Sequence, residues 1–70
     1  MAWDVPVFSK MCQAIAYNDE TNEMIVTWNN GSKGAYVGVD EETALQCSKA
    51  ASVGQYIISE VKPNYPYRKL

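Results

Sequence analysis

Histidine is absent from the 70-residue chain. Its absence removes the side chain that most often acts as a general base near neutral pH, and also a major metal ligand. Only two cysteines are present, Cys12 and Cys47, and they form no Cys-x-x-Cys pair. We therefore expect no structural zinc site and no cofactor. Both thiols are expected to be free and packed in the core, with a disulfide and a reactive thiol as the alternatives.

Long hydrophobic runs are also missing. No apolar segment approaches the roughly 20 residues of a membrane-spanning helix, so we expect no membrane partner. The first residues, MAWDVP, lack the basic start and apolar centre of a secretion signal. These absences predict a cytoplasmic protein with reduced thiols.

Catalytic motifs are missing as well. The chain has no glycine-rich phosphate loop and no serine nucleophile motif, and no histidine is available to activate a thiol. We therefore predict a protein that is not an enzyme and has no catalytic residues.

The apolar content is high enough for one packed domain. Hydrophobic residues account for 47% of the chain, which excludes a disordered chain. A chain this short is near the size at which a single core just suffices, so we expect self-association, most simply as a dimer. Residues 1–8 form a candidate arm, because Trp3, Val5, Val7 and Phe8 are more apolar than a solvated arm requires. This arm packs either on a neighbouring subunit or on the open face or edge of its own sheet.

Three segments in the first half have the β-branched and aromatic composition of strands: 11–18, 23–28 and 34–39. The last two are separated by Asn30-Gly31, a pair that tolerates the positive φ of a tight hairpin turn. Together these segments predict a three-stranded antiparallel meander.

Two short helices are expected after the meander. Asp40 is placed to cap a helix over 41–50, and Ser52 is placed to cap a second helix that ends before Pro63. A short strand over 57–61 is the alternative to the second half of that helix. The fold class is thus α+β, with both helices packed on one face of the meander and an extended C-terminal tail. The predicted core residues are Ile15, Met24, Val26, Trp28, Ala44, Cys47, Tyr56 and Ile57.

Charge is unevenly distributed along the chain. The net charge of −2 is unlike the basic surface of most nucleic-acid-binding domains. Residues 43–70, however, carry four bases and one acid, and their last part mixes cations with tyrosines and prolines. Aromatic rings can stack on bases and cations can hold phosphate, so this region predicts a site for RNA or a small nucleotide. The predicted ligand-binding residues are Arg68, Lys69, Lys62, Lys49, Ser52, Gly54, Tyr65, Tyr67 and Tyr36.

Arg68 is the expected main phosphate ligand, because its planar fork can grip two oxygens at once. The backbone amides near Ser52 and Gly54 are the expected seat for an anion. The alternative interpretation is structural: Tyr65 and Tyr67 fold back and complete the core, and the terminal cations are solvated.

Five short motifs, in this order, resemble the KTSR domain, a family found free-standing in bacteria and phages and at the C-terminus of some lysyl-tRNA synthetases. They follow Ser9 and read AIAYN (14–18), VTWNNG (26–31), YVGV (36–39), SVGQY (52–56) and YPYRKL (65–70). The resemblance covers residues 9–70, which we assign to one domain behind the arm.

The resemblance to this family also has functional implications. It implies a small binding module, with RNA binding as the activity proposed for the family. The alternative is a small homo-oligomeric protein of phage type that sequesters a host component or a nucleotide signal. The family has a tyrosine where Gly34 stands, so the resemblance implies that half of a stacking surface is missing here.

Overall fold

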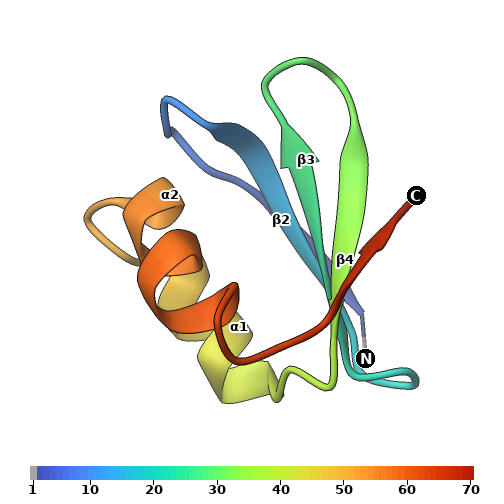
Figure 1. The fold of residues 1–70 in the computed structure, drawn as a ribbon. Coiled ribbons are helices and arrows are strands. Elements are labelled where there is room, and N and C mark those ends of the chain that lie inside the picture. The colour runs from blue at the N-terminus through green and yellow to red at the C-terminus, as the bar shows by residue number, and fades with distance from the viewer. Residues whose placement is uncertain (1) are drawn as a thin grey trace.

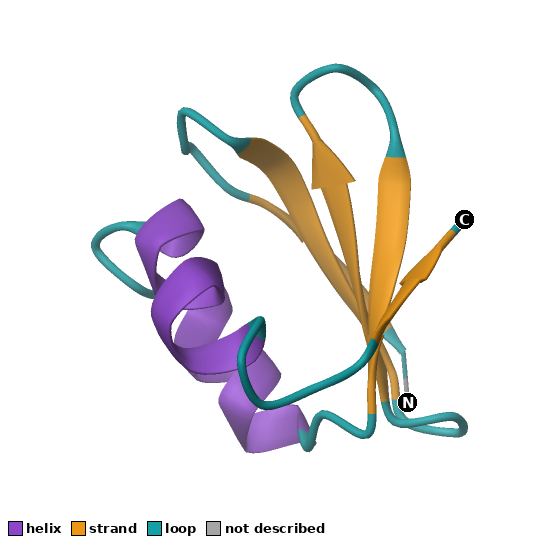
Figure 2. Ribbon diagram, in the orientation of Figure 1, coloured by secondary structure: helices purple, strands orange, loops and turns teal. Residues whose placement is uncertain are grey.

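The protein folds as a five-stranded antiparallel sheet with its helices on one face (Figures 1 and 2). The computed structural model describes residues 2–70. The strands follow one another in space as in the sequence: β1 (Trp3–Pro6), β2 (Cys12–Asn18), β3 (Glu23–Trp28), β4 (Lys33–Val37) and β5 (Tyr67–Lys69). The helical part comprises α1 (Glu41–Ser48), α2 (Val53–Tyr56) and the π-helical turn η1 (Ile57–Val61). The predicted α+β class with two short helices is confirmed, whereas the predicted number of three strands is wrong.

The two additional strands are the edges of the sheet. β1 comes from the predicted arm and pairs with β2, and β5 comes from the predicted tail and pairs with β4. Pro6 ends β1 and Pro66 precedes β5, which suits edge strands because proline cannot donate a hydrogen bond to a ladder. The arm therefore pairs with its own sheet, which was one of the two alternatives. Self-association stays a prediction.

The predicted hairpin joins β3 to β4. Gly31 has a φ of 90°, and its N–H donates to the carbonyl oxygen of Trp28 at 2.9 Å. The preceding turn, between β2 and β3, holds Asn22 at a φ of 56°. Its carbonyl oxygen accepts hydrogen bonds from the N–H groups of Gly38 and Val39, at 2.9 and 3.0 Å. This turn therefore anchors the chain where it leaves β4 for the helices.

Both helices begin where the sequence predicts, but side chains do not cap them. Asp40 and Ser52 occupy the N-cap positions in extended conformations, and neither side chain makes a capping hydrogen bond. α2 runs directly into η1, so the alternative of a strand over 57–61 is wrong. In η1 the Lys62 N–H donates to the Ile57 carbonyl oxygen at 2.7 Å, the wider i→i+5 bond of a π turn.

The core lies between the helices and the sheet face that they cover. Of the predicted core residues, Trp28 and Tyr56 are only partly buried. The other predicted members are all buried: Ile15, Met24, Val26, Ala44, Cys47 and Ile57. Among residues 2–70, no helix is long and apolar enough to cross a bilayer.

Both cysteines are free and fully buried. Burial, with a smaller contribution from Cys12, raises the pKa of the Cys47 thiol to about 12. A thiol with so high a pKa is protonated at neutral pH and is a weak nucleophile. The prediction of free thiols packed in the core is confirmed.

Candidate functional site

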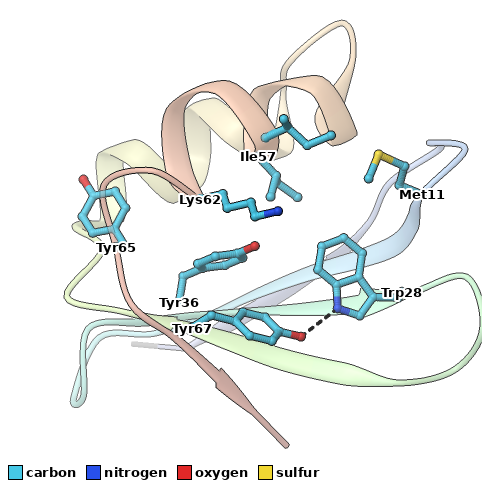
Figure 3. Close-up of a pocket in the computed structure, with 8 residues that line it drawn as sticks. Met11, Trp28, Tyr36, Ile57, Lys62, Tyr65 and Tyr67 are labelled. Carbon is cyan, nitrogen blue, oxygen red and sulfur yellow. Dashed lines mark hydrogen bonds between the residues drawn. The ribbon is translucent and has the colours of Figure 1, made fainter.

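A pocket of about 600 Å³ opens between the sheet and the end of the helical segment (Figure 3). This volume lies within the range of small-molecule sites, roughly 300–1,000 Å³. Half of the lining side chains are aromatic, and the only charged one among the described residues is a lysine. The lining residues are Met11, Trp28, Tyr36, Ile57, Ile58, Lys62, Tyr65 and Tyr67.

Three neighbouring strands build the floor of this aromatic pocket. Trp28 ends β3, Tyr36 lies on β4, and Tyr67 lies opposite Tyr36 on β5. The rings of Tyr36 and Tyr67 have centroids 5.0 Å apart and are tilted by 55°. Tyr36 is buried, whereas 46% of Tyr67 is exposed, so Tyr36 lies at the bottom of the pocket and Tyr67 at its rim.

A hydrogen bond joins two of these rings across the sheet. The Trp28 Nε1–H donates to the Tyr67 Oη at 3.0 Å (Figure 3). The bond ties the edge strand β5 to the end of β3, with β4 between them. It therefore fixes the side of the pocket that the C-terminal strand provides.

Lys62 brings a positive charge into the pocket from the helical side. It directly follows η1, and its ammonium group points into the space between the helices and the aromatic floor (Figure 3). On the floor, burial raises the pKa of Tyr36, so its hydroxyl stays neutral at pH 7. Among the described lining residues, the pocket thus presents one cation, the neutral Tyr36 hydroxyl and flat apolar surfaces. Such a set of groups suits a flat ligand that carries a negative charge.

The structure brings together four of the predicted ligand-binding residues: Lys62, Tyr36, Tyr65 and Tyr67. Ser52 and Gly54 instead line a separate hollow beside the loop between β1 and β2, where Lys10 is the nearby cation. Lys49 and Lys69 line neither this hollow nor the aromatic pocket. The predicted set is therefore divided over several places on the surface.

Arg68 lies on the opposite face of the sheet from the pocket. Successive residues of a strand point to opposite faces, so Arg68 cannot face the pocket that its neighbour Tyr67 lines. Its guanidinium donates two hydrogen bonds to one oxygen of Glu23, from Nη2 at 2.7 Å and from Nε at 3.2 Å. The expected main phosphate ligand is thus engaged in an ion pair outside the pocket.

Sequence reasoning did not assign Met11, Trp28, Ile57 and Ile58 to the site. Trp28 lies on the same face of β3 as the buried residues Met24 and Val26, so the period of the strand predicts a core position for it. Its position as the last residue of its strand is the one signal that places it at the end of the covered sheet face.

The Arg68–Glu23 pair gives a prediction about pH. The hydrogen bond from Arg68, followed by one from Thr21, lowers the pKa of Glu23 below its ordinary value of 4.5. The pair therefore contributes stability above pH 4.5, and this contribution is lost as the pH falls through the lower pKa of the folded state. In an Arg68→Met variant we expect the pKa of Glu23 to rise, as followed by NMR of its carboxyl carbon. Lys69→Met is the control, and an unchanged pKa in Arg68→Met would contradict the prediction.

The fold and the site define a small α+β domain with an aromatic pocket open to solvent at one end of its sheet. Residues 8–65 match the KTSC domain, so the chain belongs to the KTSC domain family. The family name of the sequence resemblance, KTSR, is corrected accordingly. No curated protein sequence matches the chain.

A crystal structure of a KTSC domain protein from Yersinia pestis has the same fold. It matches with a TM-score of 0.89 over 100% of this chain and 99% of that chain, at 21% sequence identity. At this identity the likeness concerns the fold alone. Among residues 2–70, no group of three or more histidine, cysteine, aspartate or glutamate side chains is placed to hold a metal ion.

Proposed function

We propose that the protein is a non-enzymatic binding module that holds a nucleotide in the aromatic pocket. The observation that carries this proposal is the arrangement of aromatic side chains around a single lysine, with no acidic side chain among the described lining residues. A nucleotide has the two complementary parts, a flat base and an anionic phosphate.

The base is expected to lie against the rings of the floor. The exposed part of Tyr67 and the partly buried indole of Trp28 leave apolar surface open to the pocket. Stacking of a base on an aromatic side chain contributes about 1–3 kcal/mol and tolerates any base, because every base has a flat face. The pocket therefore favours nucleotides as a class.

The phosphate is expected to bind Lys62. This ammonium group is the cation that points into the pocket, and a lysine binds phosphate as a point charge. Arg68, on the other face of the sheet, is already paired with Glu23. Lys62 and Arg68 thus do not lie together along one track for a long polyanion, and the net charge of the chain is −2. These features favour a single nucleotide, or one unpaired nucleotide of an RNA, over an extended strand.

Calorimetric titration with AMP, UMP, adenosine, ribose 5-phosphate and a short single-stranded RNA tests the proposal. We expect both monophosphates to bind more tightly than adenosine, which lacks the phosphate, and than ribose 5-phosphate, which lacks the base. With the single-stranded RNA, one phosphate contact predicts a slope of about −0.7 for log K against log salt. Absence of binding to all five compounds would overturn the proposal. A slope of several units with RNA would show an extended contact instead.

A second candidate function is that of a homo-oligomer which sequesters a nucleotide signal or a host component. The observation that favours it is an apolar patch beside the pocket, formed by the exposed side chains of Phe8, Met11 and Ile58. Phe8 is 99% exposed and lines the hollow that also includes Met11, while Met11 and Ile58 lie at the pocket itself. Contiguous apolar surface of this kind is typical of interaction sites.

Light scattering at micromolar concentration tests this second candidate. We expect a dimer for the unaltered chain and a shift toward the monomer for Phe8→Ser, because the substitution removes the most exposed apolar group of the patch. Leu45→Ser is the control, since Leu45 is an exposed apolar residue on α1, outside the patch. A monomeric mass for the unaltered chain would contradict self-association.

A further inference from the structure

Gly34 lies beneath the ring of Tyr67. A Cβ atom at residue 34 would overlap the Oη, Cζ and Cε1 atoms of that ring. The backbone does not account for the glycine, because positive φ values among the glycines occur at Gly31 and Gly38 and not at Gly34. The close approach of the Tyr67 ring is therefore the physical reason for glycine at this position.

The ring reaches Gly34 along a diagonal between the two strands. Tyr67 pairs with Tyr36, and Gly34 is two residues before Tyr36 on the same face of β4. Diagonal neighbours in an antiparallel pair are within reach of an aromatic side chain. The ring thus fills the place that a side chain at residue 34 would occupy, and its hydroxyl meets the Trp28 Nε1–H beyond it.

We propose that Gly34 is the positioning residue of the aromatic pocket. Because residue 34 has no side chain, the Tyr67 ring occupies the space over Gly34 and forms the outer wall of the pocket at its rim. The wall therefore exists only while the short strand β5 is paired with β4. The consequence for a ligand rests on the proposed function, whereas the position of the ring does not.

The indole N–H resonances of the protein report the position of the ring directly. In Gly34→Ala the new methyl group displaces the ring, so we expect the Trp28 indole N–H to shift and to exchange faster with water. The Trp3 indole N–H, which donates to Glu41 Oε2 at 3.1 Å, is the internal control and should not change. A Trp28 resonance that stays at its original position in Gly34→Ala would overturn the proposal.

Two further variants keep the test decisive. Tyr67→Phe retains the ring and lacks the hydroxyl, so it should alter the Trp28 resonance and largely retain AMP binding. If Gly34→Ala alone unfolds, the double variant with Tyr67→Ala should fold, because the overlapping ring is gone. A double variant that also stays unfolded would show that the glycine is needed for another reason.

The binding measurement separates this proposal from the proposed function. Gly34→Ala and Tyr67→Ala should each weaken AMP binding about tenfold, the loss of one stacking partner. The double variant should bind no more weakly than either single variant, because both changes remove the same wall. If the losses of binding free energy in the two single variants add up in the double variant, the proposed role of Gly34 is wrong. If the unaltered protein does not bind AMP, the proposed function fails, and the indole resonances still decide the position of the ring.

Discussion

Ile57→Ala is expected to lower the free energy of unfolding by about 2–5 kcal/mol, the usual cost of truncating a buried isoleucine. Ile57 is 1% exposed, begins η1, and belongs to the core cluster while also lining the pocket. The substitution removes apolar contacts and leaves a cavity that neighbouring side chains fill only in part. A domain of this size has a total stability of about 4–10 kcal/mol, so the variant would lose a large part of it.

The neighbouring residue offers a matched control. Ile58→Ala is the same substitution one position later, at a side chain that is 44% exposed. We expect this variant to change the free energy of unfolding by less than about 1 kcal/mol, because little apolar surface is lost and alanine favours a helix. Urea unfolding of both variants, with equal m values, measures the difference. Equal decreases in the free energy of unfolding for the two variants would show that Ile57 does not lie on the buried face of the helical segment.

The features that the sequence predicts well are those with local signals. The hairpin at Gly31 follows from the conformational preference of two adjacent residues, and the helix starts follow from Asp40 and Ser52. The core faces follow from periodicity, which depends only on neighbours within a few positions. Even so, the capping hydrogen bonds do not form, since the position of a polar residue does not determine where its side chain points.

The edge strands could not be predicted in the same way. β1 has four residues and β5 has three, and each pairs on one side only. Strands this short span too few residues for alternation to identify them, and Pro6 at the end of β1 and Pro66 before β5 weaken the strand signal further. β5 pairs with a strand about thirty residues earlier in the chain, a contact that only the assembled fold creates.

The candidate site was predicted only in part. The reason is that the prediction lacked the strand β5, which changes the geometry of the site. In the predicted extended tail outside the sheet, Tyr67 and Arg68 could reach the same ligand. In a strand they point to opposite faces, so Tyr67 lines the pocket and Arg68 pairs with Glu23. The space over Gly34, where the resemblance implies a missing ring, is likewise filled by Tyr67, from a strand that the sequence did not reveal.

Lys62→Met is expected to weaken AMP binding about ten- to a hundredfold. A hydrogen bond to a charged group contributes about 1.5–3 kcal/mol, and each 1.4 kcal/mol is a factor of ten. Lys62 is the charged side chain among the described residues that line the pocket, and no second cation in that set compensates for its loss. Methionine retains most of the length and the apolar stem of lysine, so the packing beside the pocket should change little.

Three comparisons identify the charge as the cause. Lys69→Met is the same substitution on β5 at a residue that does not line the pocket, and it should leave the affinity for AMP unchanged. Lys62→Arg keeps the charge and should retain most of the binding. Adenosine, which has no phosphate, should bind the unaltered protein and Lys62→Met equally. If Lys62→Met weakens the binding of adenosine and of AMP by the same factor, Lys62 shapes the pocket and does not hold the phosphate. If Lys69→Met weakens AMP binding as much as Lys62→Met does, the attraction comes from the overall charge of the C-terminal region and not from a site.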